Sequence, residues 1–449
     1  MDRASLVRQV EHALGYRHLV WAGIRGDDVE SIADLPQLSA SFSIIGSYRR
    51  RPSVESLALE DLTGRRVDLE QFDIDDHRTE PEVLTFRQAM LRALSRPSAL
   101  LPYRPSRFLS ALWFTRKDRC LNLGLFGAHQ FAFEHKPWVE TAVADLGLPT
   151  IPWVYVADEE QLDTIKMLDQ GPVVLRMSRT SGGNGFVVVQ SREDLVRCWP
   201  DAEETFVSVS PFIPDALPLN VGGTVWRDRV TVHYPSVQLI GLPQCVTRPF
   251  GYCGNDFGLA RDLDREVLSR IEQSTIRVGH WLRTMGYLGT FGVDYLLERG
   301  GTLRFTEVNP RFQGSTVASG RLAVESGEAC LLLEHIAATL GLSAPPSRSL
   351  AERLRATNPL AQLVVHWTGS EPAHLDPTTL HRGLLSRHDI VDVTTRPDLV
   401  TDRGAVVARL CFRGRLTNTG FDLREPCASA VSHWVAASLL TSLGGASHD

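Results

Sequence analysis

The stretch Gly289-Thr-Phe-Gly-Val-Asp294-Tyr-Leu-Leu-Glu-Arg-Gly-Gly-Thr-Leu-Arg-Phe-Thr-Glu307-Val-Asn309-Pro-Arg-Phe-Gln-Gly-Ser315 contains two extended runs on either side of a glycine pair. Paired glycines suit a tight hairpin turn, because its central residues need positive φ. If Gly300 and Gly301 form the whole loop, Asp294 lies directly opposite Glu307. Asn309 then shares the face of Glu307, because side chains alternate along a strand.

This arrangement predicts a bound cation. Directly opposed residues on neighbouring strands have β-carbons roughly 5 Å apart, and like charges placed so destabilise the sheet. Two carboxylates and an amide supply the oxygen ligands that suit Mg²⁺ or Mn²⁺, together with water and substrate phosphates. The remaining side chains of this face are expected to be apolar: Leu296, Leu303 and Phe305.

Two alternatives to a metal site remain. Asp294 and Glu307 could be surface charges paired with Arg299 or Arg304, but those arginines are expected at the turn or on the opposite face. A longer loop that shifted the pairing by an even number would keep the face and separate the carboxylates. The spacing favours the metal site over both alternatives.

Composition excludes several classes of protein. A chain of 449 residues with 43% hydrophobic and 22% charged residues should form two or three globular domains. A net charge of −6 argues against a dominant nucleic-acid surface, and no apolar run reaches the length of a membrane span. The seven dispersed cysteines lack a CxxC pair, which fits reduced thiols. We therefore expect a cytoplasmic protein without membrane or nucleic-acid partners.

Periodicity divides the chain into three regions. Residues 1–115 alternate helix-like and strand-like runs, which predicts an open α/β sheet. Residues 116–343 form a second unit with a hinge near residues 206–213, and residues 344–449 form an α+β C-terminal region. Strands are predicted at His18–Ile24, Ser41–Gly46, Pro172–Met177, Phe186–Val189, Thr205–Val209, Leu363–Trp367, Ile390–Thr394 and Ala405–Phe412. Helices are predicted at Glu82–Leu94, Lys136–Leu146, Asp158–Leu168, Leu263–Met285, Ala323–Leu340 and Cys427–Leu440.

A glycine-rich loop between two predicted strands is a candidate phosphate-binding element. Its backbone amides could approach phosphate oxygens closely, although it lacks the lysine and the following helix of a P-loop. Arg176, at the end of the preceding strand, would lie beside the phosphates. Lys136, one of three lysines in the chain, is a second candidate cation, with an exposed helix position as the alternative. The candidate loop residues are Ser181, Gly182, Gly183, Asn184 and Gly185.

The order of these features resembles that of ATP-grasp enzymes between Phe131 and Gly341. The resemblance is strongest in Glu307-Val-Asn-Pro-Arg-Phe-Gln-Gly-Ser315. It implies an ATP-grasp fold, in which two α+β subdomains clasp ATP. A Rossmann-like pre-ATP-grasp α/β domain would precede this fold, and the small α+β C-terminal region would follow it.

The resemblance also implies a role for each candidate residue. ATP and Mg²⁺ are the implied cofactors, with the ion held by Asp294, Glu307 and Asn309. Arg311 would steady the transferring phosphoryl group. The remaining implied nucleotide contacts are Lys136 and Arg176 at the phosphates, Ser181–Gly185 as a lid, Ser210, Phe212 and Ile213 at the adenine, and Asp215 at the ribose. Members of the family usually carry lysine where Arg176 stands, but arginine keeps the charge.

The implied activity is an ADP-forming ligation of a carboxylate to an amine through an acyl phosphate. The partners would be small-molecule acid and amine substrates, such as amino acids or short peptides in specialised biosynthesis, and a homodimer is compatible with the resemblance. The glycine-interrupted segment Gln244–Gly258 is expected to be a loop that closes over the substrate. Its Arg248 would either hold a substrate carboxylate or be solvated. Two other functions stay open: a phosphotransferase on the same nucleotide site, or a non-catalytic nucleotide-binding regulator.

Overall fold

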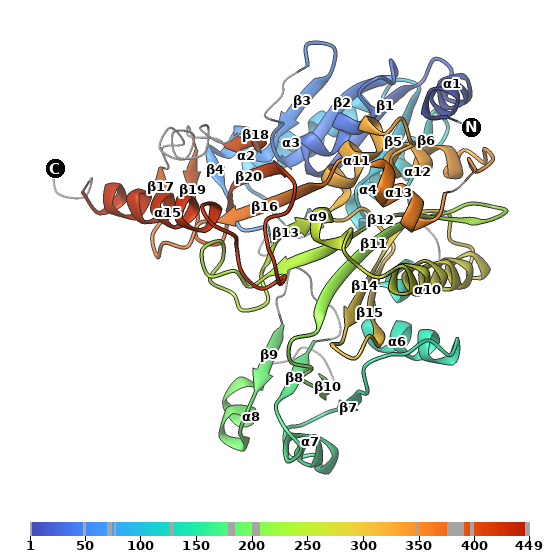
Figure 1. Cartoon of the computed structure of the whole chain (residues 1–449). Coiled ribbons are helices and arrows are strands. Elements are labelled where there is room, and N and C mark those ends of the chain that lie inside the picture. The colour runs from blue at the N-terminus through green and yellow to red at the C-terminus, as the bar shows by residue number, and fades with distance from the viewer. Residues whose placement is uncertain are drawn as a thin grey trace.

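Three sheets organise the described part of the chain: a five-stranded N-terminal sheet, a four-stranded small sheet and an eight-stranded large sheet (Figure 1). The structure is a computed structural model that describes residues 2–47, 51–69, 74–75, 78–124, 130–177, 185–199, 207–346, 348–374, 390–395 and 399–444. In the view of Figure 1 a parallel sheet lies at the top, an antiparallel sheet in the middle and a smaller sheet at the bottom.

The N-terminal sheet has five parallel strands in the order β3-β2-β1-β5-β6. Alternate residues of β1 enter separate cores: Leu19 and Trp21 pack on one face, Val20 and Ala22 on the other. Both faces are therefore covered, which explains the continuous apolar run of this strand. The predicted boundary at residue 115 falls before β6. The strands are β1 His18–Arg25, β2 Leu38–Ile45, β3 Glu55–Ala58, β5 Ser98–Pro102 and β6 Cys120–Asn122. The surrounding helices are α1 Arg3–Leu14, η1 Gly26–Ile32, α2 Leu59–Thr63, α3 Pro81–Ala93 and α4 Arg107–Phe114.

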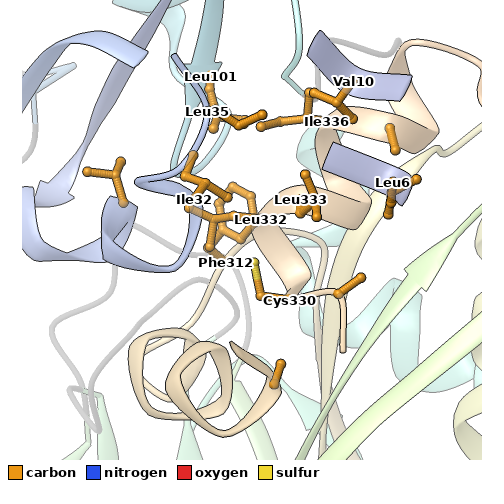
Figure 2. Packing of buried hydrophobic residues seen from close by; sticks show 14 of the residues in the cluster. Leu6, Val10, Ile32, Leu35, Leu101, Phe312, Cys330, Leu332, Leu333 and Ile336 are labelled. Carbon is orange, nitrogen blue, oxygen red and sulfur yellow. The ribbon is translucent and has the colours of Figure 1, made fainter. Parts of the chain in front are cut away.

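One hydrophobic core joins the N-terminal region to the middle of the chain. Figure 2 shows Leu6 and Val10 of α1 facing Leu333 and Ile336 of α12, with Phe312 in the same cluster. Phe312 directly follows Arg311, so this core anchors the segment that carries the candidate site. Burial of large apolar side chains of this kind contributes about 1.5–3 kcal/mol each.

The small sheet has four strands in the order β7-β10-β8-β9, with all three pairings antiparallel. Its core is compact and rich in valine, and Figure 1 shows it below the rest of the molecule. Residues 212–216 connect its strand β10 to the large sheet. Its elements are β7 Val154–Val156, α7 Leu162–Leu168, β8 Val173–Arg176, β9 Phe186–Val189, α8 Arg192–Cys198 and β10 Val207–Pro211.

The large sheet has eight antiparallel strands in the order β15-β14-β11-β12-β13-β16-β20-β18. Residues beyond the predicted boundary at 343 thus extend the sheet that residues 217–309 begin, because Asn255 of β13 pairs with Gln362 of β16. The strands are β11 Leu217–Val225, β12 Val230–Ile240, β13 Tyr252–Asp256, β14 Gly289–Leu297, β15 Leu303–Asn309, β16 Leu360–His366, β18 Ile390–Thr395 and β20 Val406–Arg413.

The remaining described elements surround these sheets. A three-stranded sheet, β17-β19-β4, pairs the N-terminal and C-terminal regions. Its strands are β4 Arg65–Arg66, β17 Ala373–His374 and β19 Val400–Thr401. The other helices are α5 Gln130–Phe133, α6 Lys136–Asp145, α9 Phe257–Ala260, α10 Arg265–Thr284, α11 Thr316–Glu325, α12 Leu331–Thr339, α13 Leu350–Ala356 and α15 Cys427–Gly444. Among the described helices, none is both long and apolar enough to cross a bilayer.

The decisive hairpin has the predicted pairing of Asp294 with Glu307, but not the predicted turn. Leu297 pairs with Leu303, so the glycines lie in a longer loop, and Gly301 adopts a φ of 82°. A bulge at Thr306 adds one residue and restores the register before Glu307.

The bulge also changes which side chains accompany the carboxylates. Leu303 and Phe305 belong to the hydrophobic core on the other face, so their predicted placement beside Asp294 was wrong. Leu296 shares the face of Asp294 as predicted, since both line the cavity described below, and it pairs with Arg304 on the neighbouring strand. Arg304 is paired with Glu298, and Arg299 is paired with Asp215 at 2.9 Å, so neither is the partner of the carboxylates.

The predicted helix Ala323–Leu340 was wrong, because the structure has two helices there. Helix α11 ends at Glu325 and α12 begins at Leu331. Gly327 adopts a φ of 68°, and the amide of Glu328 donates to the carbonyl of Ala323 at 2.8 Å. This is the glycine C-cap pattern that ends helices, and Gly327 was its signal in the sequence. The predicted helix Asp158–Leu168 begins only at Leu162.

Candidate active site

A cavity of about 550 Å³ lies where the N-terminal sheet, the small sheet and the large sheet meet. It is lined by strand ends of the N-terminal sheet, by the small sheet and its connector, and by the large sheet. Most of the residues predicted for the site line it: Arg176, Ser210, Phe212, Ile213, Asp215, Arg248, Asp294, Glu307, Asn309 and Arg311. Gly185 precedes β9 with a φ of 69°, and its carbonyl accepts from the amide of Met177. Ser181, Gly182, Gly183 and Asn184 lie outside the described residues.

Asp294 is the centre of the polar network in this cavity. Its Oδ1 accepts hydrogen bonds from Nδ2 of Asn220 at 2.6 Å and Nε2 of Gln238 at 3.2 Å, and its Oδ2 from Nδ2 of Asn309 at 3.2 Å. Burial and the neighbouring charge of Glu307 raise the pKa of Asp294 to about 7. With this pKa about half of the Asp294 carboxylates are ionised at neutral pH, and a cation beside the pair would favour the charged form.

Glu307 is the carboxylate that keeps its charge. Nζ of Lys136 lies 3.4 Å from its Oε2, and the Lys136 side chain is only 6% exposed. Although burial opposes ionisation, Lys136 and Arg176 hold the pKa of Glu307 below its ordinary value. The alternative of Lys136 as an exposed helix residue is therefore excluded.

The donor set fits a hard divalent cation. It consists of two carboxylates and the amide oxygen of Asn309, all on one end of the β14–β15 hairpin. Within the described ranges no three histidine, cysteine or acidic side chains come together as a metal cluster. A cation here would complete its shell with water or phosphate oxygens, as Mg²⁺ commonly does. Burial and then the charge of Glu307 raise the pKa of Asp294, and a cation here would offset the second of these causes.

Arg176 reaches the site from the small sheet and is held by a second carboxylate, Glu140. The guanidinium pairs with Glu140, and the hydroxyl of Tyr155 donates to the same carboxylate at 2.6 Å. Nη1 of Arg176 also donates to the carbonyl of Thr306 at 3.4 Å. Burial lowers the pKa of Arg176 to about 10, so it remains a cation at neutral pH.

Arg311 lies on the other side of the carboxylates. Its Nη2 donates to Oδ1 of Asn309 at 2.9 Å, and its Nε lies 3.3 Å from a carboxylate oxygen of Glu134. The site thus combines the buried Lys136 and the half-buried Arg176 and Arg311 with the acidic pair. Such an arrangement suits a polyanionic ligand that arrives with a divalent ion.

Four residues of this network were missed from the sequence. Glu140 had a usable signal, since it stands four residues after Lys136 and so shares its helix face. Asn220, Gln238 and Glu134 had none. Asn220 and Gln238 come from β11 and β12, and only the strand order of the folded sheet brings them to Asp294.

The connector between the small and large sheets forms one end of the cavity. The amide of Phe212 donates to the carbonyl of Pro172 at 2.8 Å, which ties the connector to the small sheet. Asp215 adopts a φ of 57°, in the left-handed region, and pairs with Arg299 at the surface. Ser210, Phe212 and Ile213 line the cavity beside it.

The predicted substrate-closing loop Gln244–Gly258 is only partly a loop. Its second half is β13, a strand inside the large sheet, and its first half is closed by a hydrogen bond from the amide of Gly241 to the carbonyl of Gly251. The prediction of one long closing loop was wrong, because the residues of β13 pair on both sides. Arg248 does line the cavity, where its Nη1 lies 3.2 Å from Oδ2 of Asp68.

Comparison with known sequences finds distant relatives of one kind. No family model matches the chain. It is 25% identical over 282 residues to a formate-dependent phosphoribosylglycinamide formyltransferase of Synechococcus sp., which covers 60% of this chain and 68% of the relative. It is 24% identical over 219 residues to the protein of the same name from Parabacteroides distasonis, covering 45% and 49%. The chain thus spans about half to two thirds of the length of these relatives.

Solved structures match over nearly the whole chain. A biotin carboxylase β-γ-ATP complex from Campylobacter jejuni has a TM-score of 0.60 at 14% identity and covers 90% of this chain and 89% of that chain. An N5-carboxyaminoimidazole synthetase from Staphylococcus aureus in complex with ADP has a TM-score of 0.59 at 11% identity, with 95% and 97% coverage. The biotin carboxylase domain dimer of Hydrogenobacter thermophilus 2-oxoglutarate carboxylase, with MgADP, has a TM-score of 0.58 at 12% identity, with 89% and 86% coverage.

Proposed function

We propose, from the premise that this chain has the ATP-grasp fold, that it joins a carboxylate to an amine at the expense of ATP and releases ADP and phosphate. The observation that carries the proposal is the Asp294–Glu307 pair facing the cavity among three cationic side chains. The names of the relatives support it, because one is a formate-dependent formyltransferase and the other a carboxyaminoimidazole synthetase in complex with ADP.

The nucleotide would occupy the cavity from the connector to the carboxylates. In this proposal Ser210, Phe212 and Ile213 contact the adenine and Asp215 the ribose. Lys136 and Arg176 bind the phosphates, and Ser181–Gly185 covers them as a lid. Asp294, Glu307 and Asn309 hold Mg²⁺, which would neutralise charge on the phosphates when bound. The connector residues, Arg176 and the three proposed metal ligands all line one cavity, which supports the assignment.

The residues of the chain would activate the acid by transfer of the γ-phosphoryl group. An oxygen of the substrate carboxylate attacks the γ-phosphorus, and the bond from that phosphorus to ADP breaks. Arg311 would offset the charge of the transferring group, because its guanidinium lies at the edge of the metal site. The amine then attacks the acyl carbon, phosphate leaves with the carbon–oxygen bond electrons, and the amine nitrogen loses a proton. Water must be excluded until the amine arrives.

The finer assignment is that the product is an amide or peptide made in amino-acid, peptide or specialised-metabolite biosynthesis. Arg248 would bind a carboxylate of one substrate, because it lines the cavity. This reaction class requires no covalent enzyme intermediate.

The test is a phosphate-release screen of small acids crossed with amines, with products identified by mass. We expect ADP and phosphate only when both an acid and an amine are present, and a hydroxamate when hydroxylamine replaces the amine. Glu307→Gln should reduce turnover by about 100-fold or more. Asp228→Asn, which changes an exposed carboxylate remote from the cavity, is the matched control. AMP and pyrophosphate as products, or a stable phosphorylated product without an amine, would contradict the proposal.

A further inference from the structure

The half of the cavity beyond the carboxylates has walls from both ends of the chain. The N-terminal sheet contributes the carboxyl ends of its parallel strands, where ligands of open α/β sheets bind. The C-terminal strands of the large sheet form the adjoining wall, because Val364 and Val406 pack in one cluster with Ile45. The lining residues of this half lie in three segments: between Ile24 and Arg104, between Arg248 and Tyr252, and between Val364 and Arg409.

The floor of this half is apolar. Ile45, Val364 and Val406 form a hydrophobic cluster that is separate from the larger cores, with Leu69 and Tyr252 packed against it. All five side chains line the cavity. Ile45, Val364 and Val406 are only 2%, 3% and 8% exposed, so the apolar surface that a ligand could cover comes mainly from the half-buried Leu69 and Tyr252. The floor therefore favours a ligand with an apolar body.

Three arginines of this half are already neutralised by aspartates. Arg25 lies 3.0 Å from Asp28, and Arg409 lies 2.9 Å from Asp27. Both aspartates are buried, with 4% exposure for Asp27 and 1% for Asp28, so they are permanent partners.

The third pair is Arg248 with Asp68, at 3.2 Å. It differs from the other two because both of its members line the cavity. Arg104 also lines this half and is itself partnered.

These pairs disfavour a phosphorylated ligand. Phosphate sites after the first strand of such sheets use glycine-rich turns whose amides face the anion. Here the turn after β1 is Gly26-Asp27-Asp28, which places two fixed negative charges behind the arginines. A phosphate dianion would have to compete with these buried carboxylates for the guanidinium groups of Arg25 and Arg409. The relatives found by sequence are named for a phosphoribosyl substrate, so this half would separate the chain from them in specificity.

We propose that the amine acceptor is an apolar amino acid without a phosphate group. The proposal rests on the proposed ligase function. The apolar floor takes the side chain, and the Arg248–Asp68 pair takes the two charges of the zwitterion, with the carboxylate on Arg248 and the ammonium on Asp68. Arg248 and Asp68 would thus determine acceptor specificity, while the nucleotide end stays common to the fold.

The test measures binding of four probes to the full chain saturated with Mg²⁺ and the analogue AMPPNP. The probes are leucine, glycine, isoamylamine and phosphoethanolamine. We expect leucine to bind about tenfold more tightly than glycine, which lacks the apolar body, and than phosphoethanolamine. Arg248→Gln should weaken leucine about tenfold and leave isoamylamine, which lacks the carboxylate, almost unchanged. Arg229→Gln, at an exposed ion pair, is the control.

A second variant tests the charge argument from the opposite direction. Asp27→Asn removes the carboxylate that lies 2.9 Å from Arg409, so phosphoethanolamine should bind about tenfold more tightly than to the parent chain. Its thermal melt establishes that the variant is folded. The proposal is overturned if phosphoethanolamine binds the parent chain as tightly as leucine, or if leucine fails to bind. AMPPNP binding in the same titrations reports on the nucleotide site separately, so failure of the acceptor proposal is distinguishable from failure of the proposed function.

Discussion

Asp294 carries a carboxylate whose ionisation is opposed by burial and by Glu307. Its pKa in the folded chain, about 7, lies above the ordinary value of 3.8. The folded state therefore keeps this proton between about pH 4 and pH 7, where the unfolded chain has lost it. Stability contributed by this group falls as the pH rises through that window and stays low above it.

Asp294→Asn should therefore stabilise the metal-free protein at pH 8 and lose this advantage as the pH falls towards 4. We expect a gain of about 1–3 kcal/mol at pH 8, allowing for water in the cavity. The measurement is the midpoint of thermal unfolding across that pH range. Mg²⁺ should stabilise the parent chain and not the variant. A variant less stable than the parent at pH 8 would show that the carboxylate pair is not strained.

Among single residues, the sequence predicted those that belong to a recognisable local pattern. Lys136, Arg176, Asp294, Glu307 and Arg311 all reach one cavity or its edge. The roles assigned to them stay predictions. Asn220 and Gln238 were invisible, because their contact with Asp294 depends on which strands are neighbours and not on any local pattern.

Helix α6 connects the small sheet to the large sheet at the candidate site. Its buried face presents Lys136 to Glu307 of the large sheet and Glu140 to Arg176 of the small sheet. Glu140→Gln removes the carboxylate that pairs with the half-buried guanidinium of Arg176, which should destabilise the protein by about 1–3 kcal/mol. We expect a lower melting temperature and weaker binding of AMPPNP, measured by calorimetric titration.

Asp145→Asn, on the exposed end of the same helix, is the matched control and should change neither quantity. Tyr155→Phe removes only one hydrogen bond to Glu140 and should have a smaller effect, of about 1 kcal/mol. Unchanged AMPPNP affinity in a folded Glu140→Gln protein would separate Arg176 from nucleotide binding.

Helices and strands were predicted well where the hydrophobic periodicity is strong. They were predicted poorly where a single residue sets the turn, the bulge or the end of a helix. The hairpin register was correct although its turn was wrong, because the longer loop and the bulge at Thr306 cancel. Neither feature is encoded by alternation, so Phe305 and Leu303 were placed on the wrong face. Helices α11 and α12 were merged because their apolar spacing continues across Gly327.

At the scale of the whole molecule, the C-terminal strands are part of the large sheet. All seven residues of β16 are buried, and β16 pairs with both β13 and β20. A chain ending at residue 343 would expose the edge of β13 and remove the core beneath it. We expect this chain to be insoluble or to lack a cooperative thermal transition, checked by its soluble fraction and circular dichroism. A cooperative melt near that of the full chain would contradict this expectation.

The fold class followed from the order of features between Phe131 and Gly341, and the structural matches confirm it. The place of the tail did not follow. Its strand-like runs have the same alternation in a separate domain as in an extension of an existing sheet. The pairing of Asn255 in β13 with Gln362 in β16 distinguishes these two cases, and the sequence of neither strand predicts this pairing.

The apolar floor of the acceptor half has a consequence for synthesis on the ribosome. Ile45 emerges early, Val364 and Val406 emerge late, and the carboxylate hairpin emerges between them. A growing chain would therefore contain every residue of its proposed nucleotide pocket before the proposed acceptor pocket has a floor. Because the large sheet needs its last strands, both pockets would form together at the end of translation.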